Sequence, residues 1–224
     1  MRRRKRLPTR RREALRHAVR ALILLLVVQN LLHLGRLLPI QAIRETEERE
    51  GVYGAKVLRR IWEPDIYKTS LFYLTANETA LLLGDAYLTH LGWMPQFGAA
   101  LDCSGGEPLY AAERTVSRFG REGTKFFFYG RADDPAIETV ELSLRYISGY
   151  DEERAENIYR EHIRLTVPEE SWIEKDGRRY FLLPYRLEDW PEKSSEHSFA
   201  VGRNSAGEVI TEFEISEGSY ASYG

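Results

Sequence analysis

Short stretches rich in Val, Ile, Tyr, Phe and Trp fill the sequence from about Ala55 onward, and clusters of Gly, Pro, Asn and Asp separate them. This alternation is typical of β-strands joined by tight turns. About ten such strands predict a mainly β fold, either an immunoglobulin-like β-sandwich or a partly open barrel. Strands are expected at residues 56–62, 69–75, 79–87, 98–102, 125–129, 137–146, 159–167, 171–174, 179–185, 197–201 and 208–215.

Turn residues support the pairing of these strands. Asp176-Gly177 separates two strand-like stretches and favours a tight hairpin, because both residues tolerate a positive φ. A second hairpin is expected across residues 204–207. Beyond residue 50, only residues 107–118 and 151–159 look helical, both weakly.

The first twenty residues hold ten Lys and Arg and a single acid, Glu13, so this segment has a net charge of +9. The whole chain has a net charge of −2, which leaves −11 for residues 21–224. Such an uneven distribution indicates an anionic partner for the N-terminal segment. A membrane fits better than a nucleic acid, because an apolar run follows the basic segment at once.

That apolar run is short for a membrane span. Fifteen residues separate Arg20 from Arg36, three of them polar, whereas a span needs about 20. Basic side chains at the ends can reach back to the headgroups, and a helix over residues 18–38 would measure about 31 Å. The sequence therefore predicts a transmembrane signal anchor at residues 18–39. Cleavage of the anchor stays open, although the residues that follow make a poor cleavage site.

The charge bias also predicts the topology, because basic flanks stay on the cytoplasmic side. The chain is expected to be a single-pass protein of the cell membrane, with a cytoplasmic N-terminus and its C-terminal domain outside. Membrane lipid is the expected partner of the helix and basic tail. The expected parts are a basic tail (1–17), the anchor (18–39), a juxtamembrane linker or helix (40–52), an extracytoplasmic β-rich domain (53–216) and a tail (217–224).

Little in the sequence points to catalysis. Cys103 is the only cysteine, so no intrachain disulfide can form, and packing is its expected role. The histidines lack the spacing of a zinc site, and neither a phosphate-binding loop nor a nucleophile elbow is present. The sequence predicts no catalytic residue, metal or cofactor, and an enzyme is the less favoured class.

Three residues are candidate contacts. Trp190 lies in a polar loop, where an exposed indole can stack on a sugar or a partner, although local packing is favoured. Asp133 and Asp134 could bind calcium together with Glu138. An Asp-Asp-Pro sequence also suits a type I turn, and the turn is the favoured interpretation.

Three segments together carry a resemblance to known proteins. They are residues 69–83 followed by Gly92-Trp93, the pattern Gly-x-x-Asp-Asp-Pro-x-Ile-x-x-Val at residues 130–140, and the closing hairpin at residues 206–210. Together they resemble a loose group of uncharacterised secreted or membrane-anchored β-rich proteins of Gram-positive bacteria, over residues 52–216. The resemblance implies an extracytoplasmic β-rich domain and brings no activity or catalytic residue.

The sequence thus favours a binding or accessory module of the cell envelope without catalytic activity. Its expected partners are an envelope protein, a peptide or a wall polymer, and not a nucleic acid. An envelope-acting hydrolase is one alternative, which would need convergent carboxylates or a Cys–His pair. A membrane-anchored regulatory sensor is the other, in which the basic tail acts through anionic lipid or a recruited protein.

Overall fold

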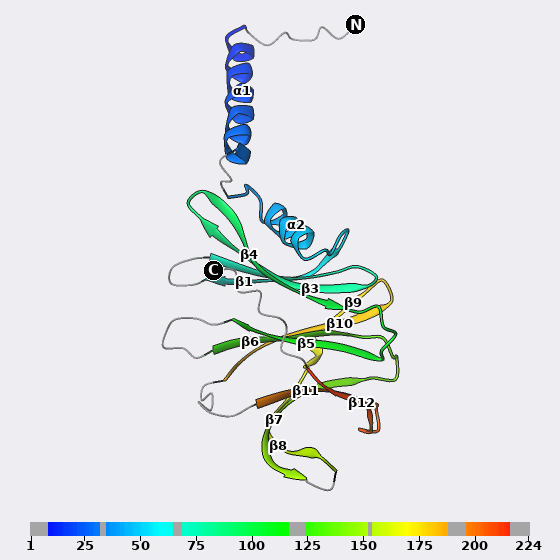
Figure 1. The fold of residues 1–224 in the computed structure, drawn as a ribbon. Helices are drawn as coiled ribbons and strands as arrows, with labels where there is room; N and C mark the ends of the chain where they lie inside the picture. The colour runs from blue at the N-terminus through cyan, green and yellow to red at the C-terminus, as the bar shows by residue number, and fades with distance from the viewer. Residues whose placement is uncertain are drawn as a thin grey trace, which may run out of the picture.

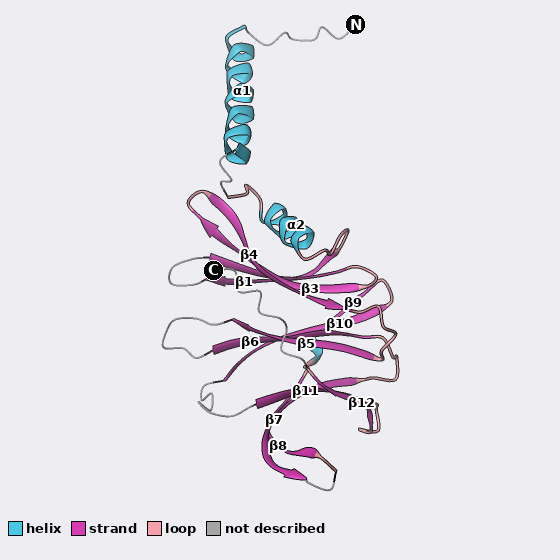
Figure 2. Cartoon of the chain, in the orientation of Figure 1, coloured by secondary structure: helices cyan, strands magenta, loops and turns pink. Residues whose placement is uncertain are grey.

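The computed structural model describes residues 9–31, 35–64, 69–116, 124–151, 154–187 and 196–215 (Figures 1 and 2). Helices α1 (Thr9–Leu31) and α2 (Pro39–Arg49) precede the strands, and a 3-10 turn occupies Glu169–Ser171. The mainly β prediction is confirmed. The strands are β1 (Lys56–Pro64), β2 (Thr69–Ala76), β3 (Ala80–Thr89), β4 (Gly92–Asp102), β5 (Leu109–Val116), β6 (Thr124–Ala132), β7 (Thr139–Asp151), β8 (Glu156–Thr166), β9 (Trp172–Lys175), β10 (Arg178–Leu187), β11 (Glu196–Arg203) and β12 (Val209–Glu214).

The strands form three antiparallel sheets of four strands each, which lie one above the other (Figure 1). The first sheet has the order β1-β2-β3-β4, the middle sheet β5-β6-β10-β9 and the third sheet β12-β11-β7-β8. Any two neighbouring layers form a sandwich, as expected. An immunoglobulin-like domain has two sheets, however, and even a partly open barrel is built from one continuous curved sheet. The three open layers seen in the described strands therefore correct both finer predictions.

The chain builds these sheets in two ways. The first sheet is a meander made from one continuous segment, residues 56–102. The other two sheets share the rest of the chain in alternating pairs of strands. Strands β5 and β6 lie in the middle sheet, β7 and β8 in the third, β9 and β10 again in the middle, and β11 and β12 again in the third.

The middle sheet is buried on both faces, which explains the unbroken aromatic run of β6. Phe126 and Phe128 face the third sheet, whereas Phe127 and Tyr129 face the first, because successive side chains of a strand point to opposite faces. All four are at most 2% exposed. A continuous apolar run of this kind is typical of a strand covered from both sides.

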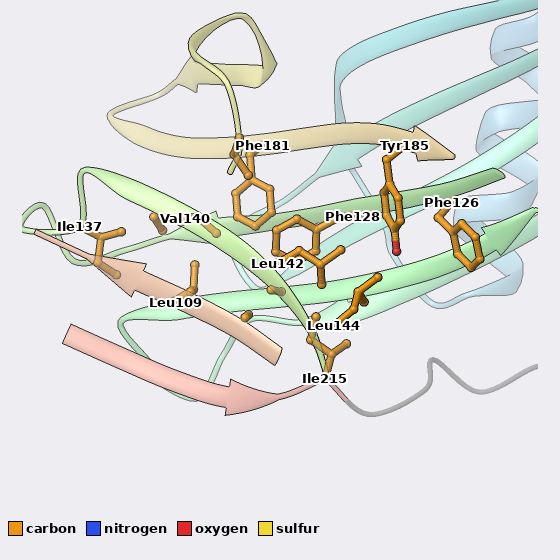
Figure 3. Packing of buried hydrophobic residues seen from close by; sticks show 14 residues of the cluster. Leu109, Phe126, Phe128, Ile137, Val140, Leu142, Leu144, Phe181, Tyr185 and Ile215 are labelled. Atoms are coloured by element: carbon orange, nitrogen blue, oxygen red, sulfur yellow. The ribbon is translucent and has the colours of Figure 1, made fainter. Parts of the chain in front are cut away.

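The core between the middle and third sheets is apolar and aromatic (Figure 3). Phe128 packs on Phe181 with ring centroids 4.9 Å apart, and Phe126 stacks on Tyr185 at 5.1 Å. From the third sheet, Val140, Leu142 and Leu144 contribute fully buried side chains. Each such aliphatic side chain contributes about 1.5–3 kcal/mol through its removal from water.

The first sheet has one core on each face. Phe72, Leu74 and Leu83 point toward the middle sheet, and Leu71 and Tyr73 point toward α2. Helix α2 contributes Ala42 and Ile43 to the second of these cores, both fully buried. The region expected to be a linker or helix is thus a helix that covers a sheet.

Of the local predictions, one hairpin is confirmed and two helices are wrong. Asp176 and Gly177 have φ values of +52° and +75°, which confirms the tight hairpin between β9 and β10. The helical expectation for residues 107–118 is wrong, because Leu109–Val116 is strand β5, whose alternate side chains enter the cores on both faces. The expectation for residues 151–159 is wrong as well, since β8 begins at Glu156.

A continuous helix across residues 18–39 is not what the structure shows. Helix α1 ends at Leu31, and α2 begins anew at Pro39. Between them Arg36 exchanges two backbone hydrogen bonds with Trp93, at 2.5 and 2.7 Å, which ties this segment to the first sheet. Neither of the described helices combines the length and the apolar character that a bilayer span requires.

Candidate functional site

The two candidate aspartates hold a turn together. Asp134 Oδ1 accepts a hydrogen bond from the Ala136 amide at 2.8 Å, and the Ile137 amide donates to the Asp134 carbonyl. Asp133 Oδ2 accepts a bond of 2.5 Å from the Arg131 guanidinium. These contacts account for both carboxylates through the β6–β7 connection, in line with the turn interpretation.

The other candidate residues are placed as follows. Trp190 lies outside the described residues. Cys103 is buried between the first and middle sheets, and burial raises the pKa of its thiol to about 11. A thiol with such a pKa stays protonated at neutral pH and is a poor nucleophile. Within the described ranges, His, Cys, Asp and Glu side chains do not gather in groups of three or more suited to a metal ion.

Buried charges link the first two sheets. Arg114 on β5 donates to Asp85 on β3 at 2.6 Å and to the Leu83 carbonyl at 3.0 Å. Burial raises the pKa of Asp85, and the adjacent guanidinium opposes that rise. Arg131 on β6 reaches the carbonyls of Cys103 and Glu78 at 2.7 and 3.0 Å. These groups were not singled out from the sequence, and their contacts indicate a structural role.

One carboxylate lies at the edge of the other core. Glu113 accepts hydrogen bonds from the hydroxyls of Tyr185 and Ser198, and so joins β5, β10 and β11. His197 is paired with Glu214 and packs against Tyr159. Neither arrangement joins an activated nucleophile to a base among the described residues.

A shallow groove of about 330 Å³ runs along α2. Its walls carry charges of both signs, and several of these are already paired: Arg36 Nε lies 2.8 Å from Glu45, and Arg44 contacts Glu47. Mixed charge and an open shape do not select one class of small ligand.

Helix α1 carries the most unusual surface of the described chain. It stands apart from the sheets (Figure 1), and its side chains are exposed at residues 11–24 and at Val27, whereas Val28 is half-buried. Leu22, Ile23, Leu24 and Val27 are between 47% and 64% exposed. Successive residues of a helix are 100° apart, so these four are spread around the axis rather than along one stripe.

The first half of the same helix is cationic. Arg11, Arg12, Arg16 and Arg20 are all exposed, and only Glu13 is acidic. Helix α1 is therefore strongly basic over residues 11–20, and the described side chains that follow, at residues 21–24, 27 and 28, are all apolar. A helix that is apolar all round normally lies in a protein core or a membrane. We take this surface of α1 as the candidate functional site.

Comparison with known proteins identifies no relative. No family model matches the sequence, no curated protein is similar to it, and no solved structure matches the fold. The resemblance to membrane-anchored β-rich proteins therefore stays a prediction, and the function has to be inferred from the chain itself.

Proposed function

We propose that this protein is a membrane-attached binding or accessory module, held on an anionic bilayer by α1 and the basic segment before it. The observation that carries the proposal is the exposure of four apolar side chains, Leu22, Ile23, Leu24 and Val27, which the described part of the body leaves uncovered. Covering the exposed half of each of them contributes about 1 kcal/mol, so an uncovered helix of this kind favours a partner.

Charge selects a bilayer over a second copy of the helix. The net charge of +9 over the first twenty residues would be repelled by an identical segment. Anionic lipid headgroups attract it instead, with about 1 kcal/mol for each basic residue near the surface. The proposed topology, with the basic segment cytoplasmic and the sheets outside, rests on that charge bias alone, because neither described helix is long and apolar enough to span a bilayer.

A binding role is preferred to hydrolysis. Asp85, Glu113 and Asp133 accept hydrogen bonds that join neighbouring sheets or fix a turn. On this proposal the three sheets present a surface to an envelope protein, a peptide or a wall polymer. Co-purification from solubilised membranes tests that part: recovery of the chain alone, at full yield, contradicts a stable partner.

Vesicle flotation tests the attachment. The full chain is expected to float with vesicles that contain anionic phosphatidylglycerol, and to bind zwitterionic vesicles far less, with an affinity that falls as salt rises. The double variant Leu22→Asp/Leu24→Asp should bind at least tenfold more weakly, because an aspartate at the centre of a membrane helix costs about 3 kcal/mol.

Val209→Asp is the matched control, because Val209 is 48% exposed and lies on β12, in the third sheet. This variant should bind as the unchanged chain does. If the double α1 variant floats as well as the control, the proposed attachment is wrong. The topology is tested separately in protoplasts, where external protease should digest the sheets.

A further inference from the structure

A second apolar surface lies on the body, close to the point where α1 is joined to it. We name it the hairpin ridge, and it consists of side chains that are between 42% and 57% exposed: Leu37, Leu38, Trp62, Leu88 and Leu91. Leu88 and Leu91 belong to the β3–β4 hairpin, which projects toward α1 in Figure 1. The other three come from the segment before α2 and from β1.

Backbone contacts gather these distant residues. Arg36 pairs with Trp93, which sets Leu37 and Leu38 beside the hairpin. The approach is close: a Cβ on Gly35 would lie 2.7 Å from a backbone carbon of Gly92. The ring of Trp62 contacts that of Trp93 edge to face, with centroids 5.6 Å apart.

The tip of the hairpin is also fixed locally. The Thr89 hydroxyl donates to the Gly92 carbonyl at 2.9 Å and accepts from the Leu91 amide at 3.1 Å. Leu88 lies opposite Trp93 in the strand register, so both side chains share one face of the sheet. The ridge is thus held in place before any partner arrives.

Chain length keeps the ridge near the membrane. The five steps from Leu31 to Arg36 reach at most about 18 Å. The helical stretch from Ala21 to Leu31 rises about 16 Å, roughly half of the 30 Å hydrocarbon core. An embedded α1 therefore holds the first sheet close to the bilayer surface. The hairpin ridge lies beside the segment that joins α1 to this sheet.

We infer that the hairpin ridge is a second membrane contact, which rests in the headgroup region and the adjoining acyl chains of the leaflet that faces the body. This inference rests on the proposed attachment through α1. Trp62 suits this depth, because indole rings concentrate at membrane–water interfaces. Arg60 lies on the same face of β1 as Trp62 and is exposed, so it can reach lipid phosphates. His90, exposed at the tip, is a polar side chain that the headgroup region accepts.

Depth-dependent fluorescence quenching tests the inference on the full chain. An environment-sensitive fluorophore is attached to the Leu91→Cys variant and, as the matched control, to Val209→Cys. Cys103 is buried and stays unlabelled. On phosphatidylglycerol-containing vesicles, nitroxide lipids should quench the label at position 91 several-fold more than the label at position 209.

The outcomes separate the two proposals. If both labelled chains float with vesicles but neither label is quenched, the ridge inference is overturned and attachment through α1 stands. If the chains do not float, both fail. A label at position 91 that shifts to the blue without lipid quenching shows that protein covers the ridge, which also overturns the inference.

A binding measurement gives a second test without labels. The double variant Leu37→Ser/Leu91→Ser removes exposed side chains only, so the fold should be retained. Its dissociation constant for anionic vesicles is expected to rise about tenfold, because two leucines no longer leave water on binding. An unchanged constant, with an unchanged circular dichroism spectrum, contradicts a ridge that touches lipid.

Discussion

The two interfaces of the middle sheet are stabilised by different means. Between the first and middle sheets, the buried Asp85–Arg114 ion pair and the Arg131 guanidinium lie among the apolar side chains. Between the middle and third sheets, aliphatic and aromatic packing dominates, and Glu113 is hydrogen-bonded at the edge. The first interface therefore depends on the pairing of buried charges, and the second on the close packing of apolar side chains.

Removal of the cation should have the largest effect. Arg114→Leu leaves the Asp85 carboxyl buried without its partner, and such changes lower the free energy of unfolding by about 3–5 kcal/mol. Urea unfolding at neutral pH measures the loss. The double variant Asp85→Asn/Arg114→Leu should recover much of it, because no buried charge is left over. A single variant that loses less than about 1 kcal/mol would show that the ion pair is not essential to this interface.

A volume change should affect the second interface slightly less. Leu142 is fully buried between the middle and third sheets, and Leu142→Ala is expected to lower the free energy of unfolding by about 3 kcal/mol, through lost burial and the cavity left behind. Leu142→Met keeps most of the volume and should lose less than about 1.5 kcal/mol. Equal losses for the two variants would contradict an interface set by packing.

The smallest effect is expected from pH. Because burial raises the pKa of Asp85, this carboxyl group binds a proton more readily in the folded chain than in the unfolded chain. The stability contributed by protonated Asp85 is present below the ordinary aspartate pKa of about 4, and it is lost as the pH rises through the raised value. The free energy of unfolding of the unchanged chain, minus that of Asp85→Asn, should therefore fall as the pH rises from 4 to 7. Leu142→Ala is the control, with a difference that stays flat.

The strands could largely be predicted from the sequence, but the number of layers could not. Alternating residues and the Asp176-Gly177 turn are local signals, and both predict the strands that form. The aromatic run of β6 indicates burial on both faces without showing what covers them. Residues 107–118 look helical because they contain Ala, Glu and Arg, yet pairing with β6 makes Leu109–Val116 a strand. Tertiary contacts override weak local propensity there.

The candidate site, too, could be predicted from the sequence only in part. The basic segment and the apolar run are contiguous, so the amino-acid sequence alone predicts a membrane contact at α1. It does not predict the hairpin ridge, because Leu37, Trp62 and Leu91 are far apart along the chain. The pairing of Arg36 with Trp93 brings them together, and no sequence motif predicts that pairing.

The order in which the sheets follow along the chain has a consequence during synthesis. The meander of the first sheet is complete at Asp102, whereas β6, which covers its inner face, ends at Ala132. A ribosome adds about 5–20 residues per second, so those thirty residues take about 2–6 s. During that delay Phe72, Leu74 and Leu83 have no middle sheet to pack against. The nascent chain thus exposes the apolar inner face of the first sheet while its N-terminal helix is already available to bind the membrane.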